Sequence, residues 1–192
     1  MFMSTKQPSR ILVIGLDCAA PRFVFGPAAF DLPNIRAVME RGCWGPLESC
    51  HPPITVPAWA CMMSGKDPGE LGCYGFRNRA DYSYDEMVTA NGASIREPRV
   101  WDTLSRHGKQ CIVIGVPQTY PPRPLRGCLV TDLLTPSTSV AYTYPESLAA
   151  ELRKAAGEYI IDVPDFRADA REGLAERIRA LMHNHFDYAE YL

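Results

Sequence analysis

The feature that most constrains the fold is a short apolar run near the start of the chain, "ILVIGL" at residues 11–16, which leads directly into Asp17. An uninterrupted run of this kind is typical of a strand buried on both faces of a parallel sheet, because a half-exposed strand alternates apolar and polar residues. We therefore predict a first strand here, with Asp17 at its carboxyl end. Ligands of open α/β sheets bind beyond that end, so Asp17 is a candidate metal ligand, with the capping of a turn as its alternative role.

Two more apolar runs, "QCIVIGV" at residues 110–116 and "CLVTDLL" at 128–134, predict further buried strands on either side of the proline-rich loop "PQTYPPRP". Apolar residues at helical spacing, and Pro or Gly near segment ends, predict helices around these strands. The predicted helices are residues 32–42, 57–65, 98–108 and 169–192. The alternation of strands and helices predicts an α/β fold with a mostly parallel sheet flanked by helices.

The segment "EMVTANGASI" at residues 86–95 interrupts this alternation. Its Asn91-Gly92 pair between two β-type runs is the strongest short-range hairpin signal, so we predict a β-hairpin insertion at about residues 77–97. The last predicted helix keeps its apolar stripe to Leu192 without a Gly, Pro or basic stop signal. We therefore expect residues 1–192 to be the N-terminal part of a single, incomplete domain.

Composition narrows the class of protein. The chain has 192 residues, of which 46% are hydrophobic, and this suits one domain with a buried core. Its net charge of -2 gives no indication of a nucleic-acid-binding surface. Its seven cysteines are odd in number and lack CxxC spacing, which indicates a reducing, cytoplasmic location. No apolar run is long enough for a signal peptide or a membrane span. The sequence does not define an oligomeric state.

Thr55 stands in "PPITVPAW", with Pro53 and Pro57 on either side and a predicted helix starting near Pro57. A threonine hydroxyl becomes a nucleophile only when a base, a metal or a positive field stabilises its alkoxide. The amino end of a helix supplies free N–H groups and the positive end of the helix dipole, and both prolines restrict the backbone. Thr55 is therefore a candidate nucleophile, and the alternative is an ordinary residue at a helix start.

Three segments in order resemble the N-terminal half of the alkaline phosphatase superfamily, most closely its type I phosphodiesterase/nucleotide pyrophosphatase branch. The segments are "ILVIGLD", "LPNIRAVMERG" and "PPITVPAWACMMSGKDPGELGCYGF". The branch shows an apolar strand ending in a metal-binding Asp, a helix of the LPNLxxLxxxG kind and a Thr-x-Pro nucleophile motif. The resemblance implies an alkaline-phosphatase-like fold, in which Asp17 is a metal ligand and Thr55 is the catalytic nucleophile that also bridges to the metal.

The chain departs from the family pattern after the nucleophile helix. Many diesterases of the branch carry an Asn there that contacts the phosphoryl oxygen. In this sequence the aligned position falls near Phe76, and Asn78 is the substrate-binding candidate. The family also takes its remaining Asp and His metal ligands from the C-terminal half, and we expect those ligands to be absent from this chain.

The four histidines do not replace the missing ligands. His51 has no counterpart in the family, and His107 lies at a predicted helix end, where a cation is favourable. His183 and His185 are two residues apart on a predicted helix and point in different directions, His185 on the apolar face and His183 outside it. The acids Asp162, Asp165 and Asp169 fit a loop better than a metal site.

The resemblance implies metal-dependent hydrolysis of phosphodiester or nucleotide pyrophosphate bonds through a covalent phospho-threonine intermediate. Two Zn²⁺ ions, or Mn²⁺ in their place, are the expected cofactors of the complete site, and a small-molecule phosphoester or nucleotide is the expected substrate. A phosphotransferase or phosphomutase of the same superfamily is one alternative, and a non-catalytic fragment or α/β binding module is another. A sulfatase is disfavoured because that branch uses Cys or Ser in a C/S-x-P-x-R motif. We expect the parent protein to be an enzyme and this chain alone to be inactive.

Overall fold

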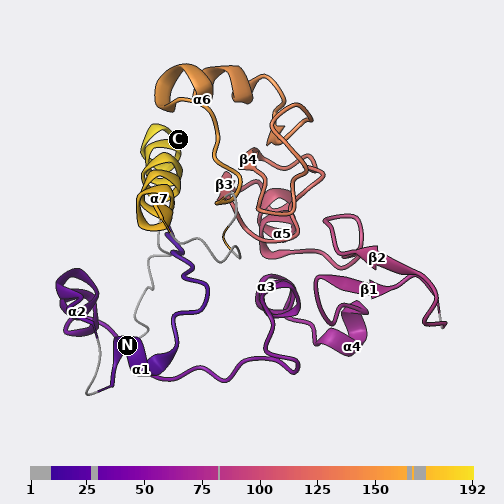
Figure 1. Cartoon of the computed structure of the whole chain (residues 1–192), viewed down its shortest axis with the longest axis horizontal. Helices are drawn as coiled ribbons and strands as arrows, with labels where there is room; N and C mark the ends of the chain where they lie inside the picture. Colours follow the sequence, from indigo (N-terminus) through magenta and orange to yellow (C-terminus); the bar gives the residue numbers. More distant parts are fainter. Residues whose placement is uncertain (1–9, 27–29, 82, 164–165, 167–171) are drawn as a thin grey trace, which may run out of the picture. The chain divides into compact units, whose positions relative to one another are not determined.

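The computed structural model describes residues 10–26, 30–81, 83–163, 166 and 172–192. The chain divides into two units, Met1–Glu48 and Ser49–Leu192, which are described separately. Figure 1 traces the elements in chain order. The helices are α1 (Pro21–Val24), α2 (Pro33–Met39), α3 (Thr55–Ser64), α4 (Pro68–Leu71), α5 (Val100–Arg106), α6 (Leu148–Ala156) and α7 (Leu174–Tyr191). The strands are β1 (Arg77–Arg79), β2 (Met87–Thr89), β3 (Cys111–Ile114), β4 (Gly127–Val130) and β5 (Thr143–Tyr144).

The first unit contains α1 and α2, both of which begin at a proline. Proline suits the first helical position because its ring presets φ and its missing N–H has no partner there. The helix predicted at residues 32–42 is thus present, although it ends at Met39 rather than near Gly42. Phe25 stacks on Trp44 with ring centroids 4.8 Å apart.

The strand predicted at residues 11–16 is not formed, and this prediction was wrong for the structure described. These residues have no strand hydrogen bonds, and the side chain of Leu12 is 84% exposed. A strand exists only through a ladder with a neighbouring strand. Every ladder among the described residues joins strands of the second unit, so the apolar run has no such neighbour.

The sheet of the second unit has the order β3-β4-β5. β3 and β4 are parallel, with Cys111 opposite Gly127 and Ile114 opposite Val130, whereas β4 and β5 are antiparallel. The two strands predicted around the proline-rich loop are therefore confirmed as parallel neighbours. The α/β class is also confirmed, but the sheet of the described residues is mixed rather than mostly parallel.

Helix α5 packs on β3 and β4 through a buried cluster of Trp101, Cys111, Val113 and Leu129. Its amino end is closed by Asp102, whose carboxylate accepts a hydrogen bond from the Arg99 N–H at 2.9 Å. Gly108, the predicted stop, follows the helix with φ of 73°, a conformation that glycine adopts without strain.

Helices α6 and α7 pack against the sheet through a second cluster, which includes Val130 of β4, Leu152 and three tyrosines. The rings of Tyr142 and Tyr159 stack at 5.5 Å, and the Tyr159 hydroxyl donates to the Thr131 carbonyl at 2.8 Å. Asn184 of α7 is buried, and its amide joins three backbone groups near the end of α6: those of Ile160, Ala156 and Glu158. The sequence predicted that α7 packs through an apolar stripe. In the structure the polar side chain of Asn184 joins α7 to the segment at the end of α6.

The two-stranded sheet formed by β1 and β2 lies within the range predicted for a hairpin, but its turn is not where the sequence indicated. The strands pair from Arg77 opposite Thr89 to Arg79 opposite Met87, so residues 80–86 connect them. Asn91-Gly92 follows β2 instead. The Asn91 carboxamide oxygen accepts from the Ala93 N–H at 2.8 Å, which forms a local turn.

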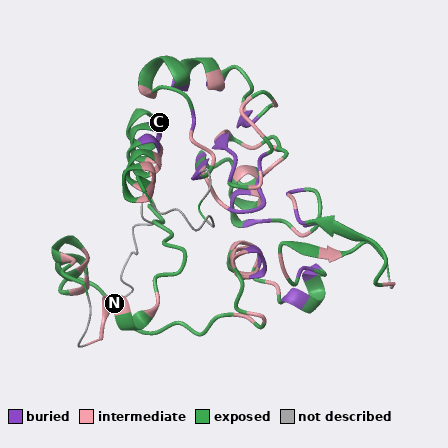
Figure 2. Ribbon diagram, in the orientation of Figure 1, coloured by how far each residue is buried: buried purple, intermediate pink, exposed green. Residues whose placement is uncertain are grey.

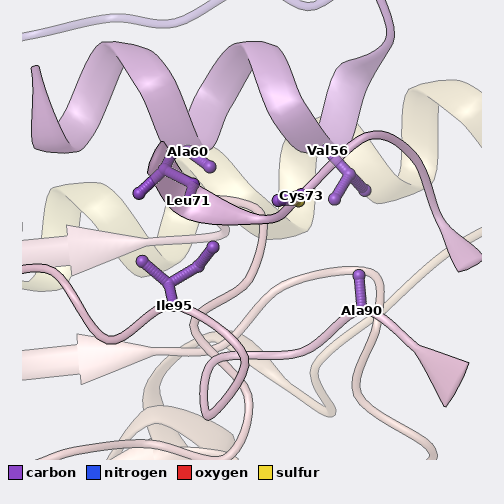
Figure 3. Close-up of a cluster of buried hydrophobic side chains, with 6 residues drawn as sticks. All are labelled: Val56, Ala60, Leu71, Cys73, Ala90 and Ile95. Carbon is purple, nitrogen blue, oxygen red and sulfur yellow. The ribbon is translucent and has the colours of Figure 1, made fainter. Parts of the chain in front are cut away.

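A third cluster lies under α3. Figure 3 shows Val56 and Ala60 on α3 facing Leu71, Cys73, Ala90 and Ile95, which come from the segments around α4 and after β2. Burial in Figure 2 is concentrated in the second unit, around these clusters. The core of that unit therefore supports α3 from below, and α3 is the helix that carries Thr55.

The pH dependence of stability should report the packing of His185. Its Nε2–H donates to the Ile160 carbonyl at 2.8 Å, its ring stacks on Tyr159, and burial lowers its pKa below the usual value. The folded chain thus binds a proton less readily than the unfolded chain, whose histidine titrates near about 6.5. Stability from this group is complete above that pH and is lost as pH falls through the unfolded and then the folded pKa.

Urea unfolding between pH 7.5 and 5.5 measures this effect. We expect His185→Phe, which keeps a stacking ring, to lose stability on acidification less steeply than the unchanged chain does. His183→Gln, an exposed substitution on the same helix, should keep the original slope. If stability fell equally steeply with pH in all three proteins, the pH dependence would not come from His185.

Candidate active site around Thr55

Thr55 is the first residue of α3 rather than a residue before it, so the predicted helix start at Pro57 was two residues late. Ile54, in an extended conformation, is the residue that caps the helix, and no side chain caps it by a hydrogen bond. Within the described part of the chain, the Thr55 hydroxyl is not assigned to any hydrogen bond. The half-buried hydroxyl is therefore not used by the fold as a helix cap.

The segment before α3 is tightly built. The peptide bond between His51 and Pro52 is cis, and the Ile54 N–H donates to the Pro52 carbonyl at 2.9 Å. Pro57 occupies the third helical position and is buried. The first N–H groups of a helix have no partner inside it, so a proline costs no hydrogen bond there, while the N–H groups of Thr55 and Val56 remain at the helix terminus.

The carboxyl end of α3 is capped by a glycine. Gly65 has φ of 70° and its N–H donates to the Cys61 carbonyl at 2.8 Å. Asp67 and Glu70 then form a capping box on α4, where the Asp67 carboxylate accepts from the Glu70 N–H at 2.9 Å. These contacts, together with the cluster under Val56, hold α3 against the rest of the second unit.

A buried arginine holds the loops beneath this helix. Arg99 is 6% exposed, and its guanidinium donates to the carbonyls of Gln118 and Gly92, both at 2.8 Å. Burial lowers the pKa of the guanidinium. Gly92 also approaches the backbone of Tyr120, so that a Cβ at this position would lie 2.9 Å from the Tyr120 oxygen. The segment after β2 is thereby joined to the loop after β3.

Asp132 is the buried acid that the sequence analysis missed as a site candidate. It lies just beyond the carboxyl end of β4 and is 1% exposed. Its carboxylate accepts hydrogen bonds from the N–H groups of Thr119, Tyr120 and Leu134 at 2.7, 3.2 and 2.8 Å. The hydroxyl of Thr119 adds a fourth at 3.0 Å. An acid within the apolar run 128–134 was the available signal, and its role here is to hold the loop after β3.

Asn78 lies in β1, and its amide is used within its own turn. The carboxamide oxygen accepts from the Tyr74 N–H at 2.8 Å, and the Nδ2 group donates to the Gly75 carbonyl at 3.2 Å. These bonds shape the turn that leads into the hairpin. Contact between Asn78 and a substrate stays a prediction.

Asp17 belongs to the first unit and Thr55 to the second, so their pairing also stays a prediction of the sequence. Asp17 is exposed, and its carboxylate accepts from the Cys18 N–H at 2.8 Å. Cys18 has φ of 59° and its thiol has a raised pKa, first because of the neighbouring Asp17 charge. The carboxylate therefore organises a sharp turn directly after the apolar run.

The histidines lie as the sequence indicated. His107 contacts the Thr103 carbonyl at 2.9 Å, His183 is exposed and His185 packs against Tyr159. Asp165 and Asp169 lie outside the described residues. Among the residues that the structure describes, no three His, Cys, Asp or Glu side chains are arranged to hold a metal ion. The described side chains thus do not fit a two-metal site, and we derive no reaction step through a metal.

Comparison with known proteins identifies the family. The model of the type I phosphodiesterase/nucleotide pyrophosphatase family matches residues 11–189. No curated protein and no solved structure matches the chain significantly. The chain therefore belongs to the type I phosphodiesterase/nucleotide pyrophosphatase family, within the alkaline phosphatase superfamily. No helix in the described ranges has both the length and the apolar character to cross a lipid bilayer.

The role assigned to Asp132 can be tested by stability. Asp132→Ala removes the acceptor of the buried Thr119 N–H and of the part-buried N–H groups of Tyr120 and Leu134. Each buried group left without a partner costs about 1–3 kcal/mol. We expect a loss in the free energy of unfolding of roughly 3–5 kcal/mol, which is at the upper end for single substitutions. Urea denaturation of the chain measures it.

Asp162→Ala is the matched control for that measurement, because exposed Asp162 accepts a single N–H, that of Val163. Its expected cost is below about 1 kcal/mol. A similar, small loss for both alanine variants would show that the Asp132 hydrogen bonds do not support the loop after β3.

Proposed function

We propose that the protein of which this chain is the Thr55-bearing part hydrolyses phosphodiester or pyrophosphate bonds of small phosphoesters or nucleotides, with Thr55 as the nucleophile. Family membership supports the reaction class. The observation that carries the residue assignment is the position of Thr55 at the first residue of α3, with its hydroxyl not used as a helix cap. The free N–H groups of this helix start favour an anion beside the hydroxyl, which supports a chemical role for Thr55.

In the proposed reaction the Thr55 oxygen attacks phosphorus, and its proton is lost as the new P–O bond forms. The bond from phosphorus to the leaving oxygen breaks, and that oxygen takes a proton. Water then attacks the phospho-threonine, releases phosphate or a phosphomonoester and restores the hydroxyl. The net reaction consumes one water molecule for each bond cleaved.

Within this chain, the amino end of α3 is the group that would stabilise the negative charge of the phosphate. N–H groups at a helix start and the positive end of the dipole attract anionic phosphate oxygens, and the effect is confined to the first turn. Thr55 lies in that turn. The buried cluster under Val56 and Ala60 keeps the helix end in place, so that little ordering remains to be done when the substrate binds.

The family is generally metal-dependent. We propose that Asp17 would give one oxygen ligand, and Thr55 another, to a divalent ion of the complete site, which would hold two Zn²⁺, or Mn²⁺. The bound ion would supply positive charge that stabilises the Thr55 alkoxide. Carboxylate oxygen at about 2.0–2.2 Å is an ordinary zinc ligand. A turn held by Cys18 N–H, as at Asp17, orients such a carboxylate while leaving its second oxygen accessible.

Thr55→Ala tests the nucleophile in a protein that combines this chain with a complete ligand set. Turnover of a chromogenic phosphodiester should fall by roughly 10³-fold or more, because the covalent step loses its attacking atom. Ser64→Ala, at the other end of α3, is the control and should keep turnover near the original value. Near-equal turnover for both variants would make the nucleophile assignment wrong, and capture of the phosphoryl group by added alcohols would indicate a transferase.

Zinc titration by calorimetry tests the metal proposal on the 192-residue chain itself. We expect at most one weakly bound ion and no appreciable diesterase activity, because the described residues form no cluster of three ligands. Asp17→Asn should remove that binding, since it removes the charge that offsets the cation.

Asp31→Asn is the control for that titration. Asp31 is another exposed acid of the first unit, paired with Arg36 at 3.3 Å, and its substitution should leave zinc binding unchanged. Two tightly bound ions with robust turnover would show that the ligand set is complete within these residues.

A further inference from the structure

The Asn91-Gly92 pair is a chemically reactive sequence that the proposed function does not use. Asparagine is a thermolabile residue, because its side-chain amide carbon is open to attack by the backbone nitrogen of the next residue. A glycine in that next position leaves the nitrogen unhindered, since it carries no Cβ. The sequence therefore places a candidate site of spontaneous deamidation in the segment after β2.

The fold holds the attacking nitrogen. The Gly92 N–H donates to the Tyr120 carbonyl, and the Gly92 carbonyl accepts from the Arg99 guanidinium at 2.8 Å. Gly92 is buried, and a Cβ on it would lie 2.9 Å from the carbonyl oxygen of Tyr120 and 3.0 Å from that of Gln118. Attack requires the Gly92 nitrogen to lose its proton and to turn away from Tyr120, so the peptide must first leave these contacts.

The asparagine that would be attacked is held as well. Its Oδ1 atom accepts from the N–H groups of Ala93 and Ser94 at 2.8 and 3.2 Å, which forms a turn of the kind that asparagine side chains stabilise. On its other side Ala90 is 1% exposed and faces the cluster under α3 (Figure 3). The reaction therefore needs a local opening of this segment, and only the opened fraction reacts.

We propose that Asn91 is a deamidation site whose reaction is gated by the release of Gly92 from Tyr120 and Arg99. After release, the Gly92 N–H gives its proton to a solvent base and the nitrogen forms a bond to the Asn91 Cγ atom. The Cγ–Nδ2 bond breaks, and Nδ2 takes a proton and leaves as ammonia. Water then opens the succinimide at either carbonyl, and the ring nitrogen regains a proton. One water molecule is consumed, one ammonia is released, and the product is aspartate or isoaspartate.

The two products differ in their effect on the fold. Aspartate keeps the main-chain length and the side-chain oxygen that accepts from Ala93, so the turn forms again. Isoaspartate carries the main chain through its Cβ and Cγ atoms, which adds one carbon before Gly92. Gly92 then does not regain its contacts with Tyr120 and Arg99 together, and the buried guanidinium loses one of its two carbonyl partners. The proposal does not depend on Thr55, because it rests on the surroundings of Asn91 alone.

The experiment compares the same Asn-Gly pair inside and outside the fold. The 192-residue chain and a synthetic peptide of residues 86–96 are kept at pH 7.4 and 37 °C, and the chain is then digested with trypsin. The tryptic peptide of residues 80–96 contains Asn91 as its only asparagine. Mass spectrometry therefore follows the conversion at this residue, and a sample taken at zero time corrects for deamidation during digestion.

We expect deamidation in the folded chain to be at least about tenfold slower than in the peptide, because only the opened fraction reacts. In urea above the unfolding transition, the chain and the peptide should react at the same rate. A folded chain that reacts as fast as the peptide, or faster, would overturn the proposal. Protection that persists in the unfolded chain would overturn it too, because the protection would then not come from the fold.

Arg99→Lys tests the contact to Gly92. Lysine keeps the charge but replaces the two nitrogens that hold the Gly92 and Gln118 carbonyls with a single ammonium group. Deamidation should accelerate severalfold in this variant. Arg123→Lys is the control and should keep the original rate, because Arg123 contacts the Ile95 carbonyl at 3.4 Å rather than Gly92. A folded Arg99→Lys chain that reacts no faster than Arg123→Lys would show that the arginine is not part of the gate.

A second measurement does not depend on whether Arg99→Lys folds. The isoaspartyl form of the chain is separated after incubation of the unfolded protein, refolded, and compared with Asn91→Asp by urea unfolding. The isoaspartyl chain should unfold at a lower urea concentration, whereas Asn91→Asp should keep a midpoint near that of the unchanged chain. Equal midpoints for the two products would contradict the contacts assigned to Gly92.

Discussion

The second unit depends on one buried cation and one buried anion that act on the same loop from two sides. The Arg99 guanidinium holds the Gln118 carbonyl, and the Asp132 carboxylate holds the N–H groups of Thr119 and Tyr120. The loop after β3 has little regular structure of its own, so its backbone groups need these partners once they are buried. Both charges are largely satisfied by backbone dipoles rather than by each other, which explains how they tolerate burial.

The loop that Arg99 and Asp132 hold is in turn connected to α3. Gln118 donates to Cys73, and Cys73 packs with Val56 in the cluster under the helix. The loop after β3 and the helix bearing Thr55 are thus connected through two short contacts. A helix start that is fixed from below can present N–H groups to an anion without first being ordered, which is the condition under which such groups contribute most to catalysis.

The sequence predicted the elements whose signal is local and failed where a partner segment decides. β3 and β4 were found because each is a continuous apolar run with its neighbour close in the chain. Residues 11–16 carry the same pattern, yet a strand also needs a ladder partner, which a pattern cannot guarantee. Asn91-Gly92 is a strong hairpin signal, but the Asn91 side chain closes a local turn after β2 instead.

The candidate site shows the same division. Thr55 and Asp17 could be singled out from motif and position, because proline spacing and an acid at a run end are visible in the sequence. The hydrogen bonds of Asp132 to Thr119 and Tyr120 could not be predicted, since these partners lie 13 and 12 residues away along the chain. The start of α3 was misplaced because Pro57 was read as the first helical residue, whereas proline is tolerated throughout the first turn.

Gly92 lies close to the Tyr120 and Gln118 carbonyls. The segment after β2 therefore tolerates substitutions and insertions less well than the connection between β1 and β2. Of the described residues that connect β1 and β2, residues 80, 81 and 84–86 are exposed and Ser83 is half-buried, and exposed loop tips tolerate insertions best. At Gly92 even one methyl group meets two carbonyl oxygens. Loops of different length, reporter tags or affinity epitopes are therefore best inserted between the strands, and the return from β2 should be kept unaltered when this protein is engineered.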